Sequence, residues 1–376
     1  MTRKALLLGL LVAGTAATAN AEVTWEGNKG RLSLGGDVEF DINAANSQVT
    51  REGQNLFGTG GTEDRWDQTG RLLLDVSGER VADSGAYAKF KAQPTLGSSG
   101  GVGSDDAWFA FGRSDVGEMK IGRFEALDLF PLGQDVFVEH SGDTSSGLYT
   151  DGSAYLYMAK EARGRAGDAG HVMVNRQLGD VYLELATLFG DRSDLFNVVD
   201  GARRYHGHEL TKEKDSIVVR PALRWQLGDF SWALGAEHNL VKDAIVDERG
   251  NDVSDRTGYG TTFGWQSGLI KANLNAAYLD ALNEENLTLG ANVLFDKFGL
   301  GYIYGRNKID EAAADYSYLE GTQQSNTVYT SYRFDNVLDL DNFGILLGAY
   351  WSDFDVEEST VATDRYGARV RFKYVF

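Results

Sequence analysis

Residues 366–376 read YGARVRFKYVF, and the character of the side chain changes at every step. One parity is aromatic or aliphatic, and the other is small or basic before a final valine. The apolar set is Tyr366, Ala368, Val370, Phe372, Tyr374 and Phe376, and the other set is Gly367, Arg369, Arg371, Lys373 and Val375. Because successive side chains of an extended strand point to opposite faces, this segment predicts a β-strand with one apolar face.

The same two-residue period recurs along the chain. Leu32, Leu34, Val38, Phe40 and Ile42 alternate with Ser33, Asp37, Glu39 and Asp41, and Ile217, Val219, Leu223 and Trp225 alternate with Val218, Arg220, Ala222 and Arg224. Such runs reach roughly ten residues, the length that a tilted strand needs to cross a bilayer. Strands of soluble proteins are commonly about 5–6 residues long. The length of the runs therefore favours membrane-spanning strands.

Tight turns alternate with long polar loops between these runs, as the two faces of a transmembrane barrel require. The tight turns are predicted near residues 82–84, 114–116, 178–180, 227–229, 266–268 and 296–297. The long loops are predicted over residues 44–64, 95–104, 190–212, 241–255, 307–325 and 355–363.

Sixteen strands are predicted, and counts of fourteen and eighteen stay open because strand boundaries are soft. Their ranges are 31–43, 66–79, 85–93, 105–112, 117–124, 170–178, 180–189, 214–226, 229–240, 257–266, 269–280, 286–296, 298–306, 326–335, 342–353 and 364–376. A further strand-like stretch at 153–160 would move every later long loop to the tight-turn face if it crossed the membrane. We therefore assign residues 125–169 to one long connection.

The predicted fold class is all-β, a transmembrane antiparallel β-barrel of about sixteen strands with a long, pore-constricting third loop. An open sheet edge has no water to bind inside lipid, so the sheet must close. A barrel of this size leaves an aqueous lumen, whereas eight strands would be filled by side chains. The mean hydropathy is negative, as in a soluble exported protein, but a barrel that alternates lipid-facing and lumen-facing residues averages in the same way.

The N-terminal residues predict export. Arg3 and Lys4 form a short basic start, residues 5–12 are apolar, and residues 19–21 read ANA with small residues at both recognition positions. This is the pattern of a secretory signal peptide, with cleavage after Ala21. Residues 1–21 are therefore the expected signal peptide, and residues 22–376 the barrel domain.

The composition excludes several classes of function. The chain has no Cys, so a disulfide framework and a catalytic thiol are both excluded. Its formal charge of −19 argues against nucleic acid as a partner. His206, His208 and Glu209 form only a weak metal candidate. The sequence contains no helical His-Glu-x-x-His motif, nucleophile elbow or phosphate-binding glycine loop. We expect a protein that is not an enzyme and holds no metal or cofactor.

The terminal Phe376, with Tyr374 and Phe372 at alternate positions, resembles the end of bacterial outer-membrane porins. Residues 122–135, GRFEALDLFPLGQD, look like the corresponding region of the sugar-transporting glycoporin branch. The resemblance implies a Gram-negative outer-membrane location and a homotrimer in contact with outer-membrane lipid and lipopolysaccharide. It also implies that the barrel-assembly machinery reads the terminal strand.

The resemblance further implies that the third loop narrows the pore and faces a basic wall. The candidate acidic residues of the loop are Glu125, Asp128, Asp135, Glu139 and Asp143. The candidate basic residues of the wall are Arg71, Lys89, Lys91, Lys120, Arg220, Arg224, Arg333, Arg369, Arg371 and Lys373. The candidates for stacking against sugar rings are Phe130, Phe137, Tyr149, Tyr155 and Tyr157. Trp66, Trp225, Trp232, Trp265 and Trp351 are assigned instead to the aromatic girdles at the membrane interfaces.

The expected function is passive diffusion of small hydrophilic solutes, with a preference for carbohydrates. One alternative is a general ion-permeable porin without a sugar site. Another is a surface adhesin or receptor whose long loops bind a partner while the lumen is closed.

Overall fold

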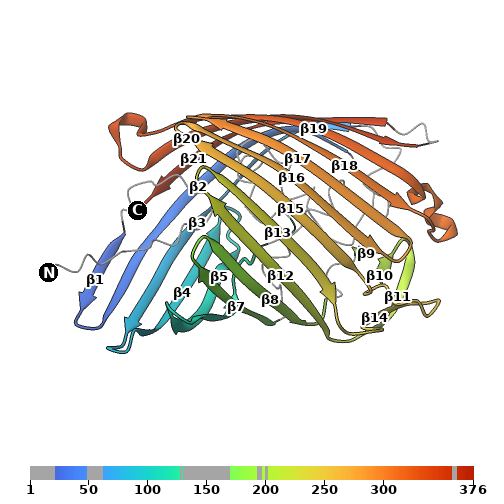
Figure 1. The fold of residues 1–376 in the computed structure, drawn as a ribbon. Helices are drawn as coiled ribbons and strands as arrows, with labels where there is room; N and C mark the ends of the chain where they lie inside the picture. Colours follow the sequence, from blue (N-terminus) through green and yellow to red (C-terminus); the bar gives the residue numbers. More distant parts are fainter. Residues whose placement is uncertain are drawn as a thin grey trace.

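The computed structural model describes residues 22–48, 62–127, 129, 170–192, 197–199, 202–357 and 362–376. Its main sheet has seventeen strands, and all of them except β1 (Val23–Gly27) form a closed antiparallel barrel (Figure 1). The predicted all-β class, the closed antiparallel barrel and the count of sixteen spanning strands are confirmed. The spanning strands are β2 (Gly30–Gln48), β3 (Thr62–Val81), β4 (Ala86–Gly97), β5 (Val102–Arg113), β6 (Gly117–Arg123), β7 (Gly170–Leu178), β8 (Val181–Gly190), β12 (Ser216–Leu227), β13 (Phe230–Asn239), β15 (Thr257–Ser267), β16 (Ile270–Ala281), β17 (Glu284–Phe295), β18 (Phe298–Ile309), β19 (Gly321–Phe334), β20 (Phe343–Val356) and β21 (Ala362–Val375).

The barrel closes where β2 pairs with β21. The register runs from Asp37 opposite Val375 to Ala45 opposite Gly367. The amide of Gly36 donates to the carbonyl of Phe376 at 2.8 Å, and the amide of Phe376 donates back at 2.9 Å. On the same strand, Gly30 to Leu34 pair with β1. One edge of β2 is therefore shared, end to end, by the first and last strands of the sheet.

The connections separate into two ends, as predicted. Two-residue turns at 179–180, 228–229, 268–269 and 296–297 lie at the end that we call the turn end. The connection between β19 and β20 at this end is longer and contains the 3₁₀ turn η4 (Val337–Asp339). At the opposite loop end a second sheet, in the order β14-β11-β10-β9, lies away from the C-terminus (Figure 1).

Three features of the loop end differ from the sequence prediction. The predicted long loop at 95–104 is mostly strand, because β4 extends to Gly97 and β5 begins at Val102. Pairing of β2 with β3 continues to Gln48 opposite Thr62, so these strands are longer than residues 31–43 and 66–79. The short strands β9 (Asn197–Val199), β10 (Ala202–Tyr205), β11 (His208–Glu213) and β14 (Ile245–Asp247) form inside segments predicted as plain loops. They are too short to show a two-residue period. In the described ranges, no helix is long and apolar enough to span a membrane.

The distribution of polarity is the reverse of that in a soluble domain. Large apolar side chains cover the outside of the barrel, including Leu274 at 62%, Phe263 at 54% and Phe372 at 36% exposure. Polar side chains such as Thr262 and Asn286 are buried on the inward parity. Soluble proteins rarely bury polar groups while exposing a continuous apolar surface, whereas a transmembrane barrel requires this arrangement.

The five tryptophans assigned to girdles lie on the outward-facing, apolar side of their strands. Trp66, Trp225 and Trp351 are exposed. Trp232 and Trp265 line an apolar groove with Phe263 and Leu274. The tryptophans therefore belong to the outer surface and not to the lumen, as an interfacial role requires.

Candidate functional site in the barrel lumen

The inward parity of β21 carries three of the predicted basic residues, and it faces the inward parity of β2. Arg371 donates from Nε and Nη2 to the carboxylate of Asp41 at 2.7 and 2.9 Å, and its Nη1 lies 3.2 Å from Glu39. The Nζ of Lys373 lies 3.0 Å from Glu39. The Nε of Arg369 lies 3.5 Å from Asp41. A charged network therefore spans the pairing that closes the barrel.

A second group of ion pairs lies on β3 to β6. Here each basic side chain meets a carboxylate on its own or a nearby strand. The pairs are Arg71–Asp105 at 3.1 Å, Lys91–Asp75 at 2.8 Å and Lys89–Glu118 at 2.5 Å. Arg71 is 35% exposed and Lys91 29%, so this wall is in contact with water. The wall is thus a row of paired charges in which hydrogen-bond donors alternate with acceptors.

Two further predicted cations lie over aromatic rings. The ammonium of Lys120 lies 4.6 Å from the ring centre of Trp108 and 5.2 Å from that of Phe124. The guanidinium of Arg224 lies 5.4 Å from the ring centre of Tyr182. Such contacts stabilise a cation by about 0.5–2 kcal/mol, depending on its desolvation. They also place aromatic faces on the inward wall, whereas the stacking candidates from the sequence lie in the loop.

All ten predicted basic residues have the inward parity of their strands. Arg333 lies beside the turn end, where its Nε pairs with Asp335 at 2.7 Å and its side chain is 37% exposed. The carboxylates of the wall itself are not among the residues that the alternation singles out. The signal was present, because Glu39 and Asp41 have the same parity as the serine and asparagine of the lumen face of β2, but the partners lie on other strands.

Loop L3 comprises residues 124–169, between β6 and β7. Its described residues, 124–127 and 129, turn toward the inside of the barrel. Phe124 stacks on His171 with ring centres 4.0 Å apart. Beyond it, the amide of Leu127 donates to Glu184 on β8 at 2.8 Å. The carbonyl of Leu127 accepts from Arg220 on β12 at 3.2 Å. Both partners have the inward parity, so the chain leaves β6 and crosses β8 and β12 on the lumen side.

Leu129 extends this path to the strands β15 and β16. Its side chain is 2% exposed and packs with Ala277 and Leu279. A Cβ on Gly260 would lie 1.8 Å from the Leu129 carbonyl oxygen, so only glycine leaves room for the chain here. Within six residues of β6, L3 therefore contacts strands well beyond its neighbours in the sheet.

Most other loop candidates lie outside the described residues. Glu125 is described and exposed. Those outside are Asp128, Asp135, Glu139 and Asp143 among the acidic residues, and Phe130, Phe137, Tyr149, Tyr155 and Tyr157 among the stacking candidates.

The inward face of β15 to β20 contrasts with the charged wall because its middle carries neutral polar side chains, with Glu284 at the loop end and Arg333 at the turn end. The neutral side chains pair across strands, as Thr262 with Asn275 at 2.7 Å and Asn273 with Asn292 at 2.9 Å. Thr262, Thr288 and Thr327 have an exposed fraction of 0%. The ion pairs on β3 and β4 are therefore in contact with water, while these threonines are not.

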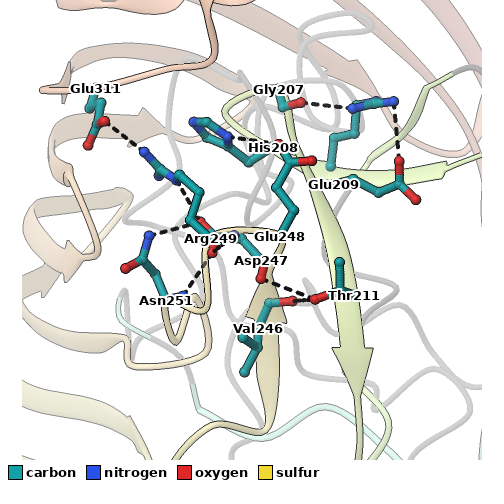
Figure 2. A network of polar contacts seen from close by, with 11 residues as sticks. Gly207, His208, Glu209, Thr211, Val246, Asp247, Glu248, Arg249, Asn251 and Glu311 are labelled. Carbon is teal, nitrogen blue, oxygen red and sulfur yellow. Dashed lines mark hydrogen bonds and ion pairs between the residues drawn. The ribbon is translucent and has the colours of Figure 1, made fainter.

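Three loops are joined at the loop end by the polar network of Figure 2. They are L4 (residues 191–215), L5 (240–256) and L7 (310–320). Arg249 on L5 donates to Glu311 on L7 at 2.7 Å, and His208 on L4 lies 3.1 Å from Glu248 on L5. Asp247 accepts from the amides of Arg249 and Asn251 at 3.0 and 2.8 Å. The described part of the chain contains no group of three or more residues suited to hold a metal.

Asp247 gives this network a predictable response to pH. Burial acts to raise the pKa of its carboxyl, but hydrogen bonds from Asn251 and Arg249 outweigh burial and hold the pKa below its ordinary value of 3.8. A carboxyl whose pKa is lowered by folding stabilises the folded state. This stabilisation is complete when the pH is above the ordinary pKa, and it is lost as the pH falls through the lowered pKa. We expect the amides of Arg249 and Asn251 to stay protected from hydrogen exchange down to pH 3.8 and to lose protection below it. Protection that disappears at a higher pH, or that is equal in an Asp247→Asn variant, contradicts this expectation.

Comparisons with known proteins agree with the barrel and its lumen. The family model described as porin-like glycoporin RafY matches residues 34–376. The outer membrane channel DcaP of Acinetobacter baumannii has a similar structure, with a TM-score of 0.58, 14% identity and coverage of 94% of this chain and 99% of that one. The anion-selective porin from Comamonas acidovorans has a TM-score of 0.56 and 13% identity, with coverage of 93% of this chain and 100% of that one. OmpT, an outer membrane protein of Vibrio cholerae, has a TM-score of 0.55 and 11% identity, with coverage of 94% of this chain and 99% of that one.

At these identities the solved structures establish the fold alone. A search of curated protein sequences finds no match. The family model covers nearly all of the barrel, including the closing strand. The chain therefore belongs to the family of porin-like glycoporins, and it is a channel of the Gram-negative outer membrane.

Proposed function

We propose that this channel passes small hydrophilic solutes by diffusion and prefers neutral carbohydrates. The observation that carries the proposal is the pairing of charges on the water-exposed wall, where Arg71, Lys89 and Lys91 each have a carboxylate within 3.1 Å. A sugar hydroxyl both donates and accepts hydrogen bonds. A wall of alternating cations and carboxylates offers it partners of both kinds and little net field to attract a free ion.

Aromatic rings on the same wall support the carbohydrate preference. Trp108 on β5 and Tyr182 on β8 are half-buried and face inward beside Lys120 and Arg224. The apolar face of a sugar ring can pack on an aromatic face while its hydroxyls bind the neighbouring charges. The family description, which names a glycoporin, points in the same direction.

We also propose that L3 narrows the lumen. The contacts of Leu127 with Glu184 and Arg220, and of Leu129 with β15 and β16, support an inward course. In this proposal Glu125, Asp128, Asp135, Glu139 and Asp143 face the charged wall, and the aromatic residues of the loop contact the solute. The neutral wall of β15 to β20, whose threonines are fully buried, is the side that the loop covers.

The remaining expectations from the family resemblance form part of the same proposal. The chain is exported with a signal peptide cleaved after Ala21. It acts as a homotrimer in contact with lipopolysaccharide, after insertion by the barrel-assembly machinery. It performs transport and no catalysis.

Single-channel conductance of the refolded chain of residues 22–376 tests the function. We expect conductance steps that recur in threes, weak preference between K⁺ and Cl⁻, and a current that falls saturably as an oligosaccharide is added. Glucose polymers of increasing length, with polyethylene glycol of equal size as control, separate binding from exclusion by size. Steps that ignore every sugar favour the general porin, and a folded barrel without conductance favours the adhesin or receptor.

A further inference from the structure

Glu284 is a buried carboxylate at the rim of the barrel. It is the first residue of β17 and shares the inward parity of Asn286 and Thr288, both of which are buried. Its side chain has an exposed fraction of 0%. A buried carboxylate is unfavourable unless its oxygens are well hydrogen-bonded, so its partners must hold a defined geometry.

Those partners come from the tip of L4. The hydroxyl of Tyr205 donates to Glu284 Oε2 at 2.9 Å and also approaches the carbonyl of Leu282 at 2.8 Å. The Nε2 of His206 lies 2.8 Å from the same Oε2. Asn286 Nδ2 donates to the other oxygen at 2.7 Å. Because Glu284 points inward, the tip of L4 lies on the lumen side of the rim of β17.

Apolar packing and the neighbouring loops fix the tip in place. Tyr205 is 2% exposed and belongs to a small buried cluster with residues of L4 and L5, namely Leu210, Ile245 and Val253. From L7, the amide of Ala313 donates to the carbonyl of His206 at 2.9 Å. Tyr316 of L7 packs against Gly207 so closely that a Cβ there would overlap its ring. The tip is therefore held from the rim, from L5 and from L7.

The tip and L7 lie over the neutral wall. At the loop end of this wall Asn286 and Gln323 have exposed fractions of 0% and 1%. Gln323 donates to the carbonyl of Leu319 in L7 at 3.0 Å. On the charged wall Arg71 is 35% exposed. The lumen beside β3 is therefore more open to water than the wall beneath the tip.

We propose that the L4 tip is a fixed cover over the neutral half of the outer mouth and that Glu284 is the positioning residue that holds it. The proposal depends on the channel itself and not on its preference for sugars. Loss of the carboxylate charge weakens the bonds from Tyr205 and His206, so the tip leaves the rim part of the time and a second, uncharged part of the mouth opens.

The test compares Glu284→Gln with Glu285→Gln in single-channel recordings. Glu285 is the next residue and an exposed carboxylate of the opposite parity, so it controls for the loss of one acidic charge at the rim. We expect Glu284→Gln to raise the open conductance, or its upper substate, by about half or more, because the pore cross-section at the mouth grows. Larger polyethylene glycols should then enter the pore. Glu285→Gln should leave both unchanged.

A Tyr205→Phe variant provides a second route to the same result, since it removes the hydroxyl and leaves the buried ring. If Glu284→Gln does not fold, this variant still decides the question. The proposal would be overturned if the variants that fold, of these two, have the same conductance and the same polymer cut-off as the unmodified channel. An equal rise in Glu285→Gln would also overturn it, because the effect would then come from charge alone.

Discussion

Replacing Arg371 with glutamine is expected to lower the free energy of unfolding by about 3 kcal/mol, near the lower end of the range for breaking a buried ion pair. The guanidinium makes two hydrogen bonds with Asp41 and a contact with Glu39. Its side chain is 9% exposed and that of Asp41 is 6% exposed. Without Arg371, Asp41 loses both of these hydrogen bonds, and the Nε of Arg369 lies 3.5 Å away. Because these residues join β21 to β2, the loss acts on the closure of the barrel.

The same substitution should make the channel prefer cations, because it leaves carboxylate charge in the lumen without its partner. Urea unfolding measures the stability, and the reversal potential in a KCl gradient measures the preference. Arg333→Gln is the matched control, since its pair with Asp335 is about one-third exposed and lies beside the turn end. Such exposed pairs contribute about 0–1 kcal/mol. The double variant Arg371→Gln with Asp41→Asn should restore much of both properties, and a failure to do so would argue against the pair as the cause.

Replacing Gly260 with alanine should displace the start of L3. The added Cβ would overlap the carbonyl oxygen of Leu129, and β15 is fixed by its pairing with β13 and β16. Among the described contacts of L3 are the bond from the Leu127 amide to Glu184 and the bond from Arg220 to the Leu127 carbonyl. We expect the loop to move, the single-channel conductance to change by about half or more, and the stability to fall by about 1–3 kcal/mol, as is typical of overpacking.

Gly97→Ala is the control for this second prediction. Gly97 is also a strand glycine, but the nearest atom to an added Cβ there lies at 3.6 Å, an ordinary contact. Its conductance should match that of the unmodified channel. If Gly260→Ala leaves both the conductance and the sugar block unchanged, the start of L3 does not take part in the constriction.

The sequence was sufficient to predict the barrel architecture, because the two-residue period of the side chains identifies the strands and their two faces. The alternation in residues 366–376 predicted both the strand and the inward parity of Arg369, Arg371 and Lys373. It did not predict their partners. Asp41 and Glu39 lie more than 300 residues away, and a shift of one residue in the register would turn the whole set to the other face. The register of the closing pair depends on the complete barrel.

The loops were less predictable for a different reason. His206 and His208 are close in sequence and suggested a weak metal candidate, but the structure places each beside a different carboxylate, Glu284 and Glu248. Loop segments of three to six residues show no period long enough to recognise. Their positions follow from contacts among L4, L5, L7 and the rim of β17, which only the folded barrel brings together.

The shared edge of β2 has a consequence for the order of folding. Contacts such as that of Arg371 with Asp41 join residues 330 positions apart, and contacts of this range form slowly because the entropy of closing the loop must be overcome first. The β1–β2 hairpin, whose strands are neighbours in sequence, can form early and occupies only the edge from Gly30 to Leu34. The edge from Asp37 onward stays open until the final strand has been synthesised. A chain shortened at its C-terminus therefore keeps an exposed, aggregation-prone strand edge along β2.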